Sequence, residues 1–300
     1  MTDPAPTVVS FTPDGAFSLA SSASFGFGPH TGRPKPDGDA MSLAFVTDDM
    51  RHHAAAVLTQ EGATVTARLL GDADPHVVEA QVARVLSLDH SGKAWEAVGE
   101  RDPVIGRLQA EHRGLRPVLF HSPYEAAAWS ILSQRRHRTQ ATAVRRRLGA
   151  EHGRVFQLPG GDLEAFPLPE DLLSVTSFPG LEPLRIERLH AVARAALDGA
   201  LEPARLLGMA SDEALADLQR LPGIGPTYAG LILLRSTGAT DILTLGEPRL
   251  PHYVRHFYGL PGTPRPDELE RLAEEWRPFR TWAGVLIRVA GDRDGVAWAS

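Results

Sequence analysis

The residues best suited to chemistry lie between positions 211 and 247. Near the centre is Leu-Pro-Gly-Ile-Gly at 221–225, which separates two segments with helical periodicity. Two glycines permit a tight turn and a close approach of the backbone, and the first amides of the following helix can face a phosphate. Such a turn would grip a nucleic-acid backbone without reading its bases. A tight connection between two core helices explains the same pattern, and the turn alone does not decide between the two.

Composition limits the chemistry that the rest of the chain can add. The 300 residues are 43% hydrophobic and 23% charged, as is typical of a soluble globular protein with a proper core. Because there is no cysteine, disulfides, thiolate metal sites and cysteine nucleophiles are excluded. Lys35 and Lys93 are the only lysines, so a Schiff-base mechanism has two side-chain candidates. The formal net charge of −6 argues against a protein that coats nucleic acid non-specifically.

The beginning of the chain and its apolar runs bear on location. Residues 1–4 show no basic segment leading into an apolar stretch, and no run approaches the roughly 18 apolar residues of a spanning helix. We therefore expect a cytoplasmic, nucleoid-associated protein that does not enter a membrane.

Strand patterns are confined to the first hundred residues. Alternation at 63–69 and an apolar run at 41–46 predict strands, and the pattern at 77–86 predicts a helix packed on them. The Gly- and Pro-rich segment 28–38 predicts an exposed loop or short linker.

From about residue 102 onward most of the periodicity is helical, with Gly and Pro punctuation between segments. We therefore predict an α+β chain, with a small N-terminal β-sheet domain over 1–98 and an all-helical domain over 99–300. The expected helices span 123–149, 169–175, 181–199, 211–220, 226–237, 249–258, 266–276 and 278–290.

Several further motifs flank the turn in a fixed order. Upstream lie Ile-Leu-Ser-Gln at 131–134 and Phe-Pro-Gly-Leu at 178–181, and downstream lies Trp-Arg-Pro-Phe-Arg-Thr-Trp-Ala at 276–283. Together with the turn at 221–225, this order resembles the helix-hairpin-helix DNA glycosylases, especially the bacterial 3-methyladenine DNA glycosylase II type. The resemblance runs from about residue 75 to 290. It implies a helix-hairpin-helix glycosylase core and, as the partner, double-stranded DNA that contains a damaged base.

The resemblance also implies a catalytic carboxylate 22 residues after Gly225, where the family has an aspartate. This chain has Glu247 there, and Asp241 matches another family aspartate in the same ungapped register. Cleavage of an N-glycosidic bond builds positive charge on the sugar, which a carboxylate can stabilise while it orients or deprotonates water. Glutamate is one methylene longer, and a misplacement of about 1 Å can cost roughly 100-fold in rate. A solvated glutamate at a helix start is the alternative.

A second implication concerns strand cleavage. Bifunctional members carry a lysine two residues after the second hairpin glycine, where this chain has Thr227. Because no lysine follows Lys93, a Schiff base with the sugar is not expected. The resemblance therefore implies monofunctional hydrolysis.

The base pocket differs from the family pattern. Thr227 and Arg288 stand where the family has aromatic residues, and Leu231 replaces a tyrosine. Other aromatic side chains could form a different stacking surface, although the helical periodicity around both tryptophans also fits a core role. The candidate pocket residues are Trp129, Thr227, Tyr228, Leu231, Trp282 and Arg288. We expect a damaged and alkylated base, but not necessarily 3-methyladenine.

The family inserts an apolar wedge into the gap left by the flipped base, and Arg135 occupies that position here. An arginine wedge could pair with the orphan base or with a phosphate, although a solvated cationic helix face is also possible. The candidate DNA contacts are Gln134, Arg135, Arg136, Leu221, Gly223, Gly225 and Thr227.

No cofactor is expected to be required, and we expect a monomer. The resemblance does imply a possible monovalent cation at the hairpin, held by the backbone carbonyls of Gln219, Leu221 and Ile224. The favoured hypothesis is a monofunctional DNA glycosylase that uses Glu247. The alternative is a catalytically weak or inactive DNA-damage-binding protein on the same fold. A helical scaffold without DNA affinity would leave the hairpin and the arginines unexplained.

Overall fold

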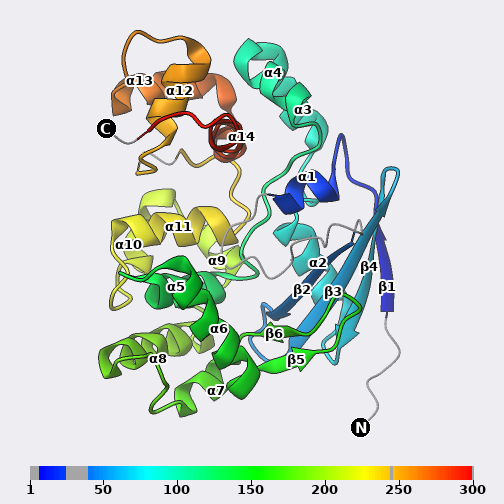
Figure 1. Ribbon diagram of the computed structural model, residues 1–300, viewed down its shortest axis with the longest axis vertical. Coiled ribbons are helices and arrows are strands. Elements are labelled where there is room, and N and C mark those ends of the chain that lie inside the picture. The colour runs from blue at the N-terminus through cyan, green and yellow to red at the C-terminus, as the bar shows by residue number, and fades with distance from the viewer. Residues whose placement is uncertain (1–6, 25–39, 244–245, 299–300) are drawn as a thin grey trace.

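The computed structural model describes residues 7–24, 40–243 and 246–298, and the loop predicted at 28–38 lies outside this part. An antiparallel sheet of four strands lies to one side of the helices (Figure 1). Its strands are β1 (Thr7–Phe11), β2 (Ala40–Val46), β3 (His53–Glu61) and β4 (Thr64–Gly71), in the spatial order β1-β4-β3-β2. The α+β class predicted from the sequence is confirmed.

The central strand β3 was not predicted, because both of its faces are covered. One face packs on α1 (Leu19–Ser24) and α2 (Pro75–Val85) through Leu58 and Ala56, and the other packs on a short hairpin through Ala55. A strand buried on both sides loses the alternation of apolar and polar residues that marks a half-exposed strand. The covering hairpin consists of β5 (Arg154–Phe156) and β6 (Leu163–Ala165).

Helices make up most of the described chain after β4, and one short helix, α1, lies between β1 and β2. They are α1 (Leu19–Ser24), α2 (Pro75–Val85), α3 (Gly92–Arg101), α4 (Pro103–Glu111), α5 (Pro123–Ser133), α6 (Arg138–His152), α7 (Pro169–Ser174), α8 (Pro183–Leu197), α9 (Pro203–Leu207), α10 (Ser211–Leu218), α11 (Pro226–Ser236), α12 (Leu250–Tyr258), α13 (Pro266–Ala273), the 3₁₀ turn η1 (Glu274–Trp276) and α14 (Arg280–Arg293). The predicted boundary between residues 98 and 99 falls inside α3, and the division into two domains stays a prediction.

The single helix expected over 123–149 is wrong, since the chain breaks between α5 and α6. The guanidinium of Arg185 on α8 donates to the carbonyl oxygens of Ile131, Leu132 and Gln134, which would otherwise end α5 without partners. The next residue, Arg135, has a positive φ of 51°. A contact from a distant helix therefore sets this break, and the local periodicity did not reveal it.

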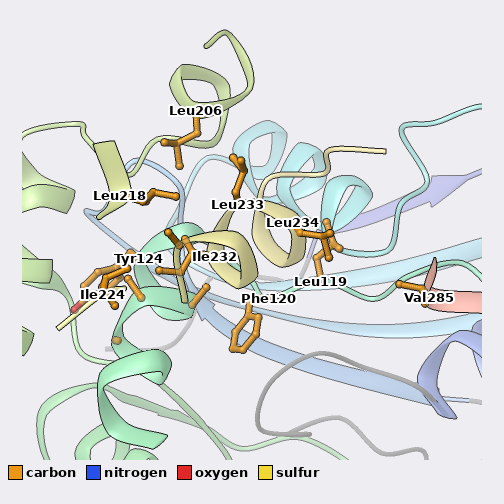
Figure 2. Close-up of a cluster of buried hydrophobic side chains, with 14 of the residues drawn as sticks. Leu119, Phe120, Tyr124, Leu206, Leu218, Ile224, Ile232, Leu233, Leu234 and Val285 are labelled. Carbon is orange, nitrogen blue, oxygen red and sulfur yellow. The ribbon is translucent and has the colours of Figure 1, made fainter. Parts of the chain in front are cut away.

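The hairpin between α10 and α11 is anchored in the main hydrophobic core. Figure 2 shows Ile224 in the same buried cluster as Tyr124 of α5, Leu218 of α10 and Ile232 of α11. Ile224 is 3% exposed although its neighbours in the turn are exposed. Burial of an aliphatic side chain of this size contributes about 2 kcal/mol, which holds the turn against the helices.

Among the described residues, no helix is both long enough and apolar enough to cross a membrane.

Candidate active site

Of the two glycines in the hairpin turn, only Gly223 has a backbone conformation that favours glycine. Gly223 has a φ of +89°, and a Cβ atom there would lie 2.8 Å from Cδ of Arg188. Gly225 is the N-cap of α11 with φ −90°, and a Cβ atom there would have no neighbour within 4 Å. Gly223 is therefore required by conformation and space, whereas Gly225 leaves open surface before the first turn of α11.

The predicted wedge segment lies directly beside this turn. Gln134 donates from Nε2 to the carbonyl oxygen of Gly223 at 2.6 Å, and its Oε1 accepts from Arg188 Nη1 at 3.1 Å. Arg135 follows, exposed and with its left-handed backbone conformation. The structure thus brings the corner between α5 and α6 and the hairpin to one place, although 89 residues separate Gln134 from Gly223.

Most other arginines of this region are paired with carboxylates. Arg136 is 14% exposed and pairs with Glu182 at 3.3 Å. Arg145 is buried against Glu125 at 2.7 Å. On the same helix, Arg146 pairs with Glu164 and Arg147 with Glu151. The run of basic letters at 135–147 is therefore much less cationic in the fold than in the sequence.

The loop that leads from α11 to Glu247 is fixed onto the start of α14. Asp241 accepts from Arg280 Nε at 2.7 Å and from Arg277 Nη1 at 2.5 Å. The backbone amide of Thr281 donates to the carbonyl of Thr240 at 2.8 Å, and the Thr281 hydroxyl accepts from the amide of Ile242 at 3.0 Å. These bonds define where the loop enters the site. Residues 244–245 lie outside the described part.

Glu247 is surrounded by three guanidinium groups from three helices or their ends. Its Oε2 accepts from Arg288 Nη1 of α14 at 3.0 Å, and Oε1 accepts from Arg249 Nε at 3.1 Å, just before α12. Arg235 of α11 completes the group, with Nη2 at 3.7 Å from Oε2. The Glu247 side chain is only 14% exposed, so the ion pairs are poorly screened by water. We call Glu247, Arg235, Arg249, Arg288 and Asp292 the arginine cluster.

Asp292 is the second carboxylate of the arginine cluster. It lies 3.3 Å from Arg249 Nη1 and 3.8 Å from Arg288 Nε, and it accepts from the hydroxyl of Tyr253 at 2.6 Å. Three guanidinium groups therefore face two carboxylates. Burial, together with the neighbouring charge of Arg288, lowers the pKa of Arg235 to about 9, because the attraction of Glu247 offsets these effects only in part. Burial also lowers the pKa of Arg288.

A hollow of about 390 Å³ borders the arginine cluster on the side of Asp292. Tyr253, Asp292, Val296 and Trp298 line it. The guanidinium of Arg249 lies 5.6 Å from the centre of the Trp298 ring, in cation-π contact. An exposed aromatic face therefore stands beside the partly buried charges.

Several known proteins are similar to this chain in sequence. No family model matches the chain. "Alkylbase DNA glycosidase-like protein mag2" of Schizosaccharomyces pombe is 24% identical over 178 residues, which are 58% of this chain and 80% of that protein. "DNA-3-methyladenine glycosylase 2" of Escherichia coli is 32% identical over 193 residues, 61% of this chain and 63% of the relative.

Solved structures show the same fold. The 3-methyladenine DNA-glycosylase from Archaeoglobus fulgidus superposes with a TM-score of 0.74 at 18% identity, over 95% of this chain and 98% of that one. The chain is similar in sequence and in fold to the helix-hairpin-helix DNA glycosylases. A DNA complex is known for a further superfamily member, the 3-methyladenine DNA glycosylase Mag1 of S. pombe with abasic DNA, at a TM-score of 0.51 and 22% identity, over 67% of this chain and 97% of that one.

In this glycosylase fold, the predicted pocket residues lie in different surroundings. Arg288 contacts Glu247 directly, so the structure brings these two predicted site residues together. Trp282 is 3% exposed and packs on the rings of Trp95 and Phe279, which favours its core role over stacking on a base. Trp129, Tyr228 and Leu231 are partly buried, and Thr227 is exposed in the first turn of α11.

The sequence reasoning missed four residues that belong to the arginine cluster or contact it. Arg249 lies two residues beyond Glu247, and Asp292 lies four residues beyond Arg288, which is the spacing of an ion pair on one helix face. These two had a local signal. Arg235 and Trp298 had none, because the fold brings them to Glu247 and Arg249 from the far end of α11 and from beyond α14.

The hairpin carbonyls predicted as cation ligands lie on the turn after α10. That of Leu221 accepts from the amide of Ile224 at 2.9 Å. Within the described residues, no group of three or more His, Asp or Glu side chains could hold a metal ion.

Proposed function

We propose that this protein is a monofunctional DNA glycosylase, which hydrolyses the N-glycosidic bond of a damaged base flipped from duplex DNA. The class suggested by the names of its relatives is an alkylated base. The observation that carries the proposal is the placement of Glu247. It lies at the opposite end of α11 from the hairpin, about 14 Å along the helix, on a loop fixed to α14.

In this proposal, the hairpin and the corner between α5 and α6 bind the DNA. The amides after Gly225 face a backbone phosphate, with Leu221, Gly223 and Thr227 in the same surface. Gln134 holds the corner against the hairpin, and Arg135 enters the gap left by the flipped base. Arg136, which pairs with Glu182, supports the corner. A monovalent cation at the carbonyls of Gln219, Leu221 and Ile224 would reinforce the turn.

The chemistry assigned to Glu247 is hydrolysis without a covalent intermediate. The bond between C1′ and the base nitrogen breaks, and its electron pair leaves with the base. The carboxylate stabilises the positive charge that develops on the sugar and directs water to C1′. The proton lost by the water ends on the released base when that base leaves as an anion, and in the solvent when a cationic base leaves as the neutral molecule. Lys93 lies on α3, paired with Asp14 at 3.1 Å, and Thr227 has no amine, so no strand cleavage through a Schiff base is expected.

Base release from lesion-containing duplexes tests the assignment. With a panel of alkylated, deaminated and oxidised bases, we expect release by the wild type and a fall of at least about 100-fold in Glu247→Gln, because the amide carries no charge. Duplex affinity should stay within about twofold. The matched control is Glu270→Gln, the same change at an exposed position on α13. Equal release by wild type and Glu247→Gln would contradict the assignment.

One observation favours the second candidate, a catalytically weak or inactive DNA-damage-binding protein. Three guanidinium groups lie around Glu247, and they offset its charge where positive charge would have to develop on the sugar. That candidate predicts binding to damaged duplexes without base release. A gain of release in Glu247→Asp would then show that the fold retains the other requirements.

A further inference from the structure

Damaged bases differ in charge, and the guanidinium groups of the arginine cluster would interact differently with charged and uncharged bases. Alkylation at a ring nitrogen such as N7 of guanine leaves the base with a positive charge. Deaminated, oxidised or oxygen-alkylated bases are uncharged and present carbonyl or ring-nitrogen acceptors. A cationic site repels the first group, whereas a guanidinium can donate to adjacent acceptors of the second.

The arginine cluster contains more guanidinium groups than carboxylates, and its side chains are partly buried from solvent. Within the described part of the chain, Arg235, Arg249 and Arg288 face Glu247 and Asp292, and the three guanidinium side chains are 19%, 24% and 17% exposed. Asp292 is itself engaged by Arg249 and by the hydroxyl of Tyr253. The positive charge is therefore not balanced within the cluster, and the surrounding protein screens it less than water would.

Arg288 has the position from which this charge would act on a base. It contacts Glu247 at 3.0 Å, and the proposed reaction places the glycosidic bond beside that carboxylate. The electron-rich face of an aromatic ring would attract a cationic base. A guanidinium is positively charged and repels such a base. Its planar donors match paired acceptors such as O6 and N7 of a purine.

We propose that the arginine cluster makes this protein selective for uncharged damaged bases and that Arg288 is the residue that disfavours cationic ring-alkylated purines. The inference rests on the proposed function, since it assumes that the base is held beside Glu247. An uncharged base leaves less readily than a cationic one. A guanidinium at its acceptors offsets the negative charge that the base gains when the C1′–N bond breaks, before the proton from water neutralises it.

Two isosteric probes isolate the effect of charge. One duplex carries 7-methylguanine, which is cationic, and the other carries 7-methyl-7-deazaguanine, which has the same shape without the charge. Both bases lie opposite cytosine and carry a 2′-fluoro group on an arabino sugar, which blocks hydrolysis. Affinities are measured by fluorescence anisotropy relative to the undamaged duplex. We expect wild type to bind the uncharged probe at least fivefold more tightly.

Variants assign the preference to Arg288. In Arg288→Gln the preference should fall below twofold, whereas Arg288→Lys should keep most of it because the charge remains. Arg293→Gln on the same helix, where Arg293 is exposed and pairs with Glu111, is the matched control and should behave as wild type. Thermal unfolding of each variant confirms that it is folded. If Arg288→Gln does not fold, Arg288→Met, which also removes the charge, supplies the test and should likewise reduce the preference below twofold.

Equal or tighter binding of the cationic probe by wild type would overturn the inference. An unchanged preference in folded Arg288→Gln would also overturn it. Because neither probe is cleaved, this result does not depend on catalysis. Loss of base release from the lesion panel, with the charge preference intact, would count against the proposed hydrolysis and leave the selectivity standing.

Discussion

At the scale of single residues, Glu125 shows how a buried carboxylate joins the sheet to the helices. It is 4% exposed, accepts from the backbone amide of Val46 at the end of β2, and pairs with Arg145 at 2.7 Å and His121 at 3.2 Å. Burial alone would raise its pKa, but the charges of His121 and Arg145 and their hydrogen bonds outweigh burial and hold the pKa at about 2.

A pKa lowered by folding stabilises the native state at pH values above the unfolded pKa. For Glu125 that contribution is present above about 4.5 and is lost as the pH falls toward 2. The shift corresponds to about 3 kcal/mol. We expect the free energy of unfolding of wild type, measured by urea denaturation, to fall between pH 5 and pH 2.5 more steeply than that of Glu125→Gln.

Glu125→Gln should also be less stable at pH 7, by about 3 to 5 kcal/mol, because it leaves Arg145 buried without its counter-charge. The exposed Glu187→Gln on α8 should match wild type at every pH. Parallel pH curves for wild type and Glu125→Gln would show that this carboxylate is not the source of the acid sensitivity.

Among the structural elements, the hairpin contains one glycine that the fold requires, Gly223, and one that leaves its surface open for binding, Gly225. Gly223 has a positive φ and no room for a Cβ atom beside Arg188 and Ile131. Gly225 has an ordinary φ and open space. The same substitution at the two glycines therefore probes two different properties of the turn.

We expect Gly223→Ala to destabilise the protein by about 1 to 3 kcal/mol, since alanine there is strained and crowded. Gly225→Ala should leave the free energy of unfolding within about 0.5 kcal/mol and lower duplex affinity, because a methyl group would stand between the amides of α11 and a phosphate. Chemical denaturation measures the free energy of unfolding of both variants, and titration with duplex DNA measures their affinity. Full duplex affinity in Gly225→Ala would contradict a close backbone contact with DNA.

At the scale of the whole molecule, the distribution of charge matters more than its total. The chain has a formal net charge of −6, and many arginines near the hairpin are paired with carboxylates. Arg135 is exposed beside the turn. A protein of this kind should bind DNA through a few phosphate contacts and not through a broad basic face.

We therefore expect the logarithm of the duplex binding constant to fall with the logarithm of salt concentration with a slope of about −3, as for three or four phosphates. Arg135→Gln should reduce the size of the slope by about 0.9. Arg51→Gln, an exposed change in the turn between β2 and β3, should not alter it. A slope near zero for wild type would contradict phosphate binding altogether.

Features encoded by residues close together in the chain could be predicted before the fold was known. The glycine and proline pattern at 221–225 predicted a hairpin between two helices, and apolar periodicity predicted the segments that became α7, α8, α10, α11 and α12 to within about two residues. The same motifs indicated the superfamily that the comparisons support. These predictions succeeded because turns and amphipathic helices are encoded by residues close together in the chain.

Features that depend on partners far apart in the chain are visible only in the folded protein. The break after α5 depends on Arg185, the strand β3 is hidden because both faces are covered, and Arg145 is neutralised by Glu125. The surroundings of Glu247 are the clearest case, since Arg288 lies 41 residues away in the sequence and Arg235 reaches the carboxylate from another helix. Charge in a folded protein depends on which side chains packing brings together and shields from water, and no local pattern records that.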